Sequence, residues 1–173
     1  MSKQEPIKAM EIHGEKKKIV LAGNPNVGKS VFFNSLTGIY VDVSNFPGTT
    51  VDVSHGHFEE YAVIDTPGVY GISSFNDEEK VARDVILTAD LIVNVVDAVH
   101  LERDLFLSLQ VIETGIPTII VLNMMDDAKR EGLKIDLALL EEQLGVPVIP
   151  AVAIKGKGLK ELKEKLREAR TGN

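Results

Sequence analysis

Cysteine and tryptophan are both absent from this 173-residue chain. Without cysteine the chain forms no disulfide and offers no thiolate metal site, so cysteine usage does not fix a compartment. Long apolar runs are also missing, since none approaches the roughly 20 residues of a membrane-spanning helix. A basic excess is missing too, because the formal net charge is −7. A nucleic-acid-binding domain would be basic, so nucleic acid is not an expected partner.

What is present is typical of one globular domain. With 44% hydrophobic residues, the chain is long enough to bury a substantial core. Residues 1–17 are polar and charged. They are expected to form a flexible tail, and residues 18–173 the folded domain.

Apolar, strand-like runs alternate with amphipathic, helix-like runs along the folded part. The expected strands are Lys18–Ala22, Val51–His55, Phe58–Asp65, Leu91–Asp97, Thr118–Asn123 and Val148–Val152. The expected helices are Lys29–Leu36, Asp77–Thr88, Leu101–Thr114, Leu137–Leu144 and Leu159–Ala169. Several of the strands are apolar at nearly every position, as in strands covered on both faces. This alternation predicts an α/β fold with a mostly parallel, six-stranded sheet and helices on both faces.

Two stretches depart from the regular alternation. His55-Gly56-His57 lies between two expected strands and predicts a hairpin turn, which would leave both histidines exposed and make one edge strand antiparallel. Two histidines across a turn do not make a metal site without further ligands. The stretch from Gly38 to Thr50 has no clear structure of its own. A long loop of this kind beside a phosphate site is usually functional.

The strongest motif is the run G-N-P-N-V-G-K-S over residues 23–30, which fits the phosphate-binding loop G-x-x-x-x-G-K-[ST]. An apolar strand precedes it and a helix follows, whereas a chance glycine-rich turn would lack this context. Glycines let the backbone N–H groups point at phosphate oxygens, and the helix N-terminus adds partial positive charge. Lys29 supplies a full charge for the β- and γ-phosphates, and the Ser30 hydroxyl can ligate Mg²⁺.

A second motif, Asp65-Thr66-Pro67-Gly68, ends another expected strand. Parallel α/β sheets bind ligands at such strand ends. Asp65 can hold Mg²⁺ through a water, and the Gly68 N–H can meet the γ-phosphate. Alone, this sequence is also a good turn, but its position after a phosphate loop makes it a strong signal.

A third motif, N-x-x-D, ends a further strand at Asn123 and Asp126. Asp126 offers two carboxylate oxygens to the N1–H and N2–H₂ donors of guanine. Adenine lacks this donor pair and would leave the carboxylate unpaired. Asn123 would orient the loop and touch the base. A capped strand end explains N-x-x-D alone equally well, but the three motifs in this order are the marks of a GTPase.

Beyond the class, the chain resembles the FeoB-type ferrous iron transport GTPases from about residue 18 to residue 166. The resemblance is carried by S-N-F-P-G-T-T-V at 44–51, N-V-V-D-A at 94–98, L-E-R-D-L at 101–105, L-N-M-M-D at 122–126, L-G-V-P-V at 144–148 and K-G-K-G at 155–158. It implies a Ras-like P-loop G domain at the cytoplasmic face of the cell membrane. In that family a helical spacer domain and transmembrane segments follow, and homo-oligomers of the full-length protein are possible partners.

The resemblance also implies the site. Thr50 matches the threonine of the first switch that closes on Mg²⁺ and the γ-phosphate, with Thr49 as the alternative. The implied catalytic residues are Asn26, Lys29, Thr50 and Gly68. The implied nucleotide-binding residues are Gly23, Asn24, Pro25, Asn26, Val27, Gly28, Lys29, Ser30, Val31, Thr49, Thr50, Asp65, Thr66, Pro67, Gly68, Asn123, Met124, Asp126, Val152, Ala153 and Ile154. The Mg²⁺ ligands are Ser30, Thr50 and Asp65.

Two positions bear on hydrolysis. Val69 stands where Ras-like proteins carry a glutamine that orients the attacking water, and valine cannot hydrogen-bond water. In related GTPases an asparagine matching Asn26 helps to bind K⁺ with backbone carbonyls of the first switch. We therefore hypothesise a K⁺ site formed by Asn26 and the backbone near Ser44 and Phe46, which could supply transition-state charge. Alternatively, Asn26 satisfies only backbone groups of its own loop.

At the last nucleotide motif the chain departs from the family. Val152-Ala153 replaces the usual Ser-Ala, although the Ala153 N–H could still bond the guanine O6. The expected function is GTP binding and slow hydrolysis that controls Fe(II) uptake. Two alternatives stay open: a soluble GTPase of ribosome or tRNA biology, and a nucleotide sensor with negligible turnover.

Overall fold

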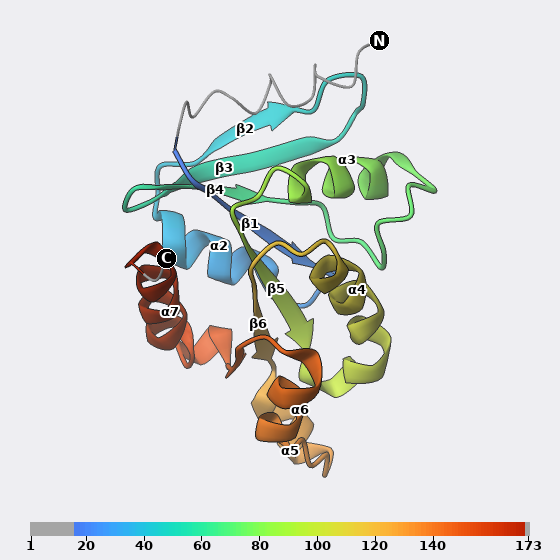
Figure 1. Ribbon diagram of the computed structural model, residues 1–173, viewed down its shortest axis with the longest axis vertical. Coiled ribbons are helices and arrows are strands. Elements are labelled where there is room, and N and C mark those ends of the chain that lie inside the picture. Colours follow the sequence, from blue (N-terminus) through green and yellow to red (C-terminus); the bar gives the residue numbers. More distant parts are fainter. Residues whose placement is uncertain (1–15, 172–173) are drawn as a thin grey trace.

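A seven-stranded sheet runs through the domain (Figure 1). Its strands are β1 Lys18–Gly23, β2 Asp42–Asn45, β3 Asp52–Phe58, β4 Tyr61–Asp65, β5 Leu91–Asp97, β6 Thr118–Asn123 and β7 Val148–Pro150, in the spatial order β2-β3-β4-β1-β5-β6-β7. This computed structural model describes residues 16–171. The tail expected over residues 1–17 therefore lies outside the described residues, apart from its last two. Within residues 16–171, no helix is long and apolar enough to cross a bilayer.

The sheet is mixed but mostly parallel, as predicted. Strands β4, β1, β5, β6 and β7 pair in parallel, and β3 is antiparallel to both β4 and β2. The expected count of six strands is wrong, because β2 forms inside the stretch that was expected to be a loop. Three of the four β2 residues are exposed, so this edge strand leaves no apolar alternation in the sequence. The antiparallel strand β3 is therefore second from the edge rather than at it.

The hairpin between β3 and β4 turns at Glu59 and Glu60, not at the two histidines. Strand β3 runs through His55-Gly56-His57, and His55 is buried rather than exposed. Gly56 serves a close approach instead of a turn, because a Cβ there would lie 2.9 Å from the Thr37 side chain. Only His57 is exposed as expected.

Helices cover both faces of the sheet, as predicted. They are α2 Lys29–Thr37, α3 Asp77–Ile86, α4 Leu101–Glu113, α5 Met125–Arg130, α6 Leu137–Leu144 and α7 Leu159–Thr171, with short 3₁₀ turns at Ala98–His100 and Ala153–Lys155. Figure 1 shows α2 and α7 on one face and α3 and α4 on the other. The short helix α5, which carries Asp126, was not expected from the sequence.

The core consists of an apolar layer on each face of the sheet. Along β1, Ile19 and Leu21 join the layer beneath α2 and α7, whereas Val20 and Ala22 join the layer beneath α3 and α4. Successive side chains of a strand point to opposite faces, so a central strand must be apolar throughout. This double burial fixes β1, and with it the loop that leaves its carboxyl end.

Candidate nucleotide site

The phosphate loop connects the end of β1 to the start of α2. Asn26 and Gly28 have positive φ values of 64° and 87°, so the backbone curls in a left-handed sense. Such curls gather successive N–H groups into an anion-binding concavity. A Cβ on Gly28 would lie 2.4 Å from Asn123 Nδ2, so this position requires glycine. The chain thus presents a preformed cradle of the kind that holds phosphate.

Lys29 begins α2 and lies against the end of β4. Its Nζ contacts the Asp65 carboxylate and the Thr66 carbonyl oxygen. The two side chains are largely buried, with 11% of Lys29 and 19% of Asp65 exposed. Burial raises the pKa of Asp65 above its usual value, and the charge of Lys29 partly offsets this effect. The ammonium group of Lys29, from the first motif, therefore contacts the carboxylate of Asp65, from the second motif.

The segment Asp65–Gly68 packs directly on the phosphate loop. The Thr66 hydroxyl donates to the Leu21 carbonyl oxygen at 2.6 Å, and the Val69 N–H donates to the Gly23 carbonyl oxygen at 3.0 Å. A Cβ on Gly68 would lie 2.8 Å from the Cα of Pro25. Gly68 therefore packs so closely on the phosphate loop that a side chain there would clash with the backbone of Pro25.

Val69 points away from the site. Its side chain is 4% exposed and packs in the apolar layer beneath α3 and α4. Nothing at this position offers a hydrogen bond to an attacking water. We call residues 69–76, which lead from here to α3, the switch II segment.

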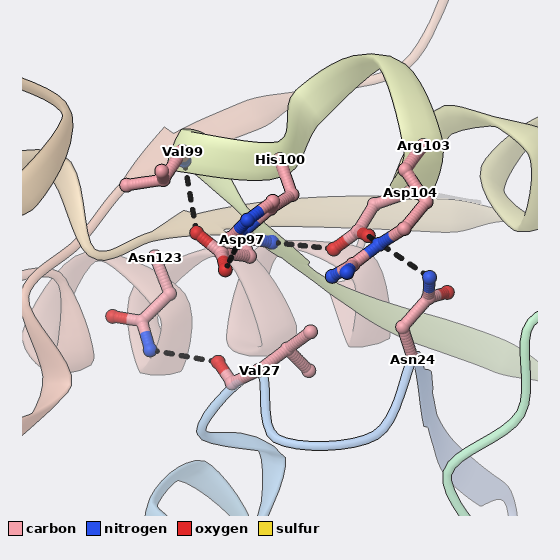
Figure 2. Close-up of polar contacts among 8 residues, drawn as sticks. All are labelled: Asn24, Val27, Asp97, Val99, His100, Arg103, Asp104 and Asn123. Carbon is pink, nitrogen blue, oxygen red and sulfur yellow. Dashed lines mark hydrogen bonds and ion pairs between the residues drawn. The ribbon is translucent and has the colours of Figure 1, made fainter.

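Asn123, at the end of β6, joins the phosphate loop to the last nucleotide motif, and Figure 2 shows its bond to Val27 of the phosphate loop. Its Nδ2 donates to the Val27 carbonyl oxygen at 2.9 Å, and its Oδ1 accepts from the Ala153 N–H at 3.0 Å. The side chain is 3% exposed. The Ala153 N–H, expected to bond guanine O6, is thus occupied by Asn123 in this arrangement.

Asp126 lies in the first turn of α5, where its carboxylate is 21% exposed. Its Oδ2 lies 3.3 Å from Lys155 Nζ, and its Oδ1 accepts from the Asp127 N–H at 2.9 Å. Met124 precedes α5 with a positive φ of 62°, a sharp bend that turns the chain from β6 into the helix. Val152 and Ala153 are buried, whereas Ile154 is 82% exposed. These residues form a second lobe beside the phosphate loop.

The expected first-switch residues are not brought to this centre. Thr49 Oγ1 donates to the Phe46 carbonyl oxygen at 2.8 Å, inside the turn between β2 and β3. Thr50 is exposed, and among residues 16–171 no hydrogen bond joins it to Ser30 or Asp65. Ser30 itself is exposed at the start of α2.

The hypothesised K⁺ ligands are likewise apart. Asn26 is exposed, the Ser44 hydroxyl lies 3.1 Å from His55 Nε2, and Phe46 is buried. The Phe46 carbonyl oxygen already accepts from the N–H and the hydroxyl of Thr49. Among residues 16–171, no hydrogen bond joins Asn26 to the turn between β2 and β3.

Sequence reasoning missed one residue beside the phosphate loop. Asp104, in α4, is 1% exposed and accepts a hydrogen bond from the side chain of Asn24. The available signal was its spacing from Leu107 and Val111, which form the buried stripe of the same helix. An acidic residue on an apolar stripe requires buried partners.

Comparison with known proteins agrees with this geometry. The sequence profile of the family described as "Ferrous iron transport protein B" matches residues 17–166. The chain is 42% identical over 159 residues to the Fe(2+) transporter FeoB of Shigella flexneri, which covers 86% of this chain and 21% of that protein. The same identity and coverage hold for the Fe(2+) transporter FeoB of Escherichia coli K12. The chain thus spans about a fifth of the length of the curated relatives that it matches.

Solved structures of similar proteins share the fold. A variant of S. thermophilus NFeoB bound to GDP superposes with a TM-score of 0.83 at 44% identity, covering 88% of this chain and 62% of that one. The FeoB G-domain of Methanococcus jannaschii gives a TM-score of 0.74 at 41% identity and covers 88% of this chain and 96% of that one. This Ras-like architecture, the profile match and the identity to the transporters agree, and the chain belongs to the ferrous iron transport protein B family.

Proposed function

We propose that this domain binds GDP and GTP with Mg²⁺, hydrolyses GTP, and uses its nucleotide state to control ferrous iron passage through membrane segments of a longer protein. One observation carries the proposal. The Asn123 side chain bonds both the phosphate loop and the Ala153 loop, which sets the two halves of a nucleotide site side by side. The GDP-bound relatives at 44% identity support the same ligand.

The phosphates would occupy the glycine cradle of residues 23–30. The oxygen donors at its rim, the Ser30 hydroxyl and the Asp65 carboxylate, suit Mg²⁺, and Thr50 is the proposed third protein ligand. Bound there, Mg²⁺ would neutralise charge on the phosphate oxygens. Lys29 Nζ contacts Asp65. Because the lysine side chain is long and flexible, Nζ could turn from Asp65 to phosphates bound in the cradle.

The guanine would be read by Asp126. Its carboxylate is partly exposed, and its Oδ2 pairs with Lys155 while its Oδ1 accepts from the Asp127 N–H, so guanine would exchange the Lys155 ion pair for the base donors. Wild-type protein should bind a fluorescent GDP analogue far more tightly than the ADP analogue. Asp126→Asn should shift this preference from guanine to xanthine nucleotides, and Lys29→Ala should abolish tight binding. If Lys29→Ala left GDP affinity unchanged, the phosphate-loop assignment would be wrong.

Hydrolysis without a glutamine after Gly68 requires another source of charge, and we propose K⁺ held by Asn26. GTP turnover is compared in KCl and NaCl at equal ionic strength for wild type and Asn26→Ala. Strong K⁺ activation that is lost in the variant supports the cation site and a slow basal rate. Equal rates in both salts would refute it.

The buried Val69 favours one rival function, a nucleotide sensor with negligible turnover. Single-turnover hydrolysis separates the two, because a sensor would hold GTP intact for the lifetime of the complex. Both functions predict the same binding, so the rate of phosphate release decides between them.

The proposed setting is the cytoplasmic face of a cell membrane, with helical spacer and transmembrane partners in the same protein and possible homo-oligomers. Identity to Fe(2+) transporters supports iron as the cargo. In a full-length transporter that carries this domain, Lys29→Ala should reduce uptake of labelled Fe(II). Unchanged uptake would show that nucleotide binding does not control transport.

A further inference from the structure

Asp104 is a buried charge outside the three nucleotide motifs. It lies near the start of α4 and is 1% exposed. Isolated ionised carboxylates are strongly disfavoured in an apolar interior, so a buried one is retained only where hydrogen bonds satisfy its oxygens. The hydrogen-bond partners of Asp104 therefore indicate which parts of the structure its buried carboxylate holds together.

Three donors satisfy this carboxylate, and they come from three parts of the chain (Figure 2). Oδ1 accepts from Asn24 Nδ2 at 2.9 Å and from Arg103 Nε at 3.0 Å. Oδ2 accepts from the Asp97 N–H, at the end of β5, at 2.9 Å. The side chain thus ties the first residue after Gly23 in the phosphate loop to the sheet and to α4.

Arg103 extends this connection to the switch II segment. Its guanidinium lies 5.6 Å from the centroid of the Tyr70 ring, which is within cation–π range. Two turns further along α4, Gln110 Oε1 accepts from the Ile72 N–H at 2.9 Å. One face of α4 therefore supports the switch II segment, through Tyr70 and Ile72.

We propose that Asp104 is a positioning residue of the nucleotide site: it holds Asn24 so that the phosphate loop keeps the conformation that binds phosphate. Arg103, which contacts both Asp104 and Tyr70, makes this interaction depend on the position of Tyr70. The inference rests on the proposed nucleotide binding and deepens it. Movement of the switch II segment would separate Tyr70 from Arg103 and weaken the hydrogen bond between Asp104 and Asn24. The phosphate loop would then bind the phosphates less tightly. Nucleotide release is thereby coupled to switch II through α4.

The hydrogen-bond geometry makes a distinctive prediction for two substitutions. Asn24 Oδ1 is buried and accepts no hydrogen bond from the described residues. In Asp104→Asn the new amide can donate to this oxygen if the Asn24 side-chain amide turns over, so the link to the loop is kept in the opposite direction while the bond from Arg103 Nε is lost. In Asp104→Ala no group replaces the carboxylate. Loss of a buried, charge-assisted bond changes an equilibrium roughly tenfold to a hundredfold.

The test measures the dissociation rate of a fluorescent GDP analogue and the melting temperature of each variant. Asp104→Ala should release GDP roughly tenfold to a hundredfold faster, and Asp104→Asn should recover part of that loss. Asn24→Ala should resemble Asp104→Ala, and the double variant should add little. Ser108→Ala is the matched control, because Ser108 is buried in the same helix and its hydroxyl bonds Asn94 and the backbone of Asp104, but neither the Asp104 carboxylate nor the phosphate loop. It should lower stability without faster release.

Each outcome decides the proposal. Release from Asp104→Ala within twofold of wild type would overturn it, as would equal acceleration by Ser108→Ala. Asn24→Ala gives the same decision if Asp104→Ala does not fold. Arg103→Ala and Tyr70→Ala should each accelerate release, and their combination should be no faster than Arg103→Ala alone; additive effects would refute the link to switch II. If wild type fails to bind GDP, the proposed function itself is wrong.

Discussion

Substitution of Asn123 by alanine should destabilise the fold and the site together. The change removes a donor to the Val27 carbonyl oxygen and an acceptor for the Ala153 N–H, both buried. A buried polar group left without a partner costs about 1–3 kcal/mol, so the two together should lower the free energy of unfolding by about 3 kcal/mol. For a domain of this size, that corresponds to a melting temperature lower by roughly 6–12 °C.

Thermal unfolding and titration with a fluorescent GDP analogue measure both effects. Asp126→Ala is the matched control, because its carboxylate is partly exposed and its ion pair with Lys155 contributes little to stability. It should weaken GDP binding and leave the melting temperature within about 2 °C of wild type. If Asn123→Ala melted like wild type, or kept wild-type GDP affinity, the bridging role of Asn123 would be refuted.

Three further predictions follow from local geometry. Gly68→Ala places a Cβ 2.8 Å from the Cα of Pro25, so single-turnover GTP hydrolysis should fall by about a hundredfold, and a near-normal rate would contradict the close approach. Burial raises the pKa of Asp65, so just above pH 3.8 the folded protein keeps the carboxyl proton of Asp65 while the unfolded chain loses it. The free energy of unfolding of wild type relative to Asp65→Asn, measured with urea, should therefore fall as pH rises from 3.8. A rise in this difference would refute the raised pKa. Asn76→Ala removes the cap bond that Asn76 Oδ1 accepts from the Glu79 N–H, which should lower stability by about 1 kcal/mol in the same assay. Unchanged stability would show that this cap does not stabilise α3.

The features that the sequence predicted correctly share one physical cause. Central parallel strands are buried on both faces, so β1, β5 and β6 must be apolar along their length, and the pattern is visible without a structure. The three nucleotide motifs follow such strands directly, and their meeting at one edge of the sheet is a consequence of parallel pairing.

The features that were missed depend on contacts between distant residues. The sequence His55-Gly56-His57 is typical of a turn. Only the packing of Thr37 against Gly56 explains why a glycine lies within a strand. Strand β2 exists because β3 offers it a partner. Asn24 and Asp104 are 80 positions apart, so no local pattern could connect them.

The marginal position of β2 has a thermodynamic consequence. Three of its four residues are exposed, so lifting Asp42–Asn45 from the sheet would uncover little more of their own side chains and would chiefly break the backbone ladder to β3. Phe46, the residue directly after β2, is buried, so displacing the chain beyond Asn45 would begin to expose the core. Moving a two-state element from 1:99 to 99:1 requires only about 5.5 kcal/mol of differential binding, which a few contacts to a terminal phosphate and its cation can supply. The strand with the largest share of exposed residues thus lies next to the turn that carries Thr50, where its displacement would disturb the core least.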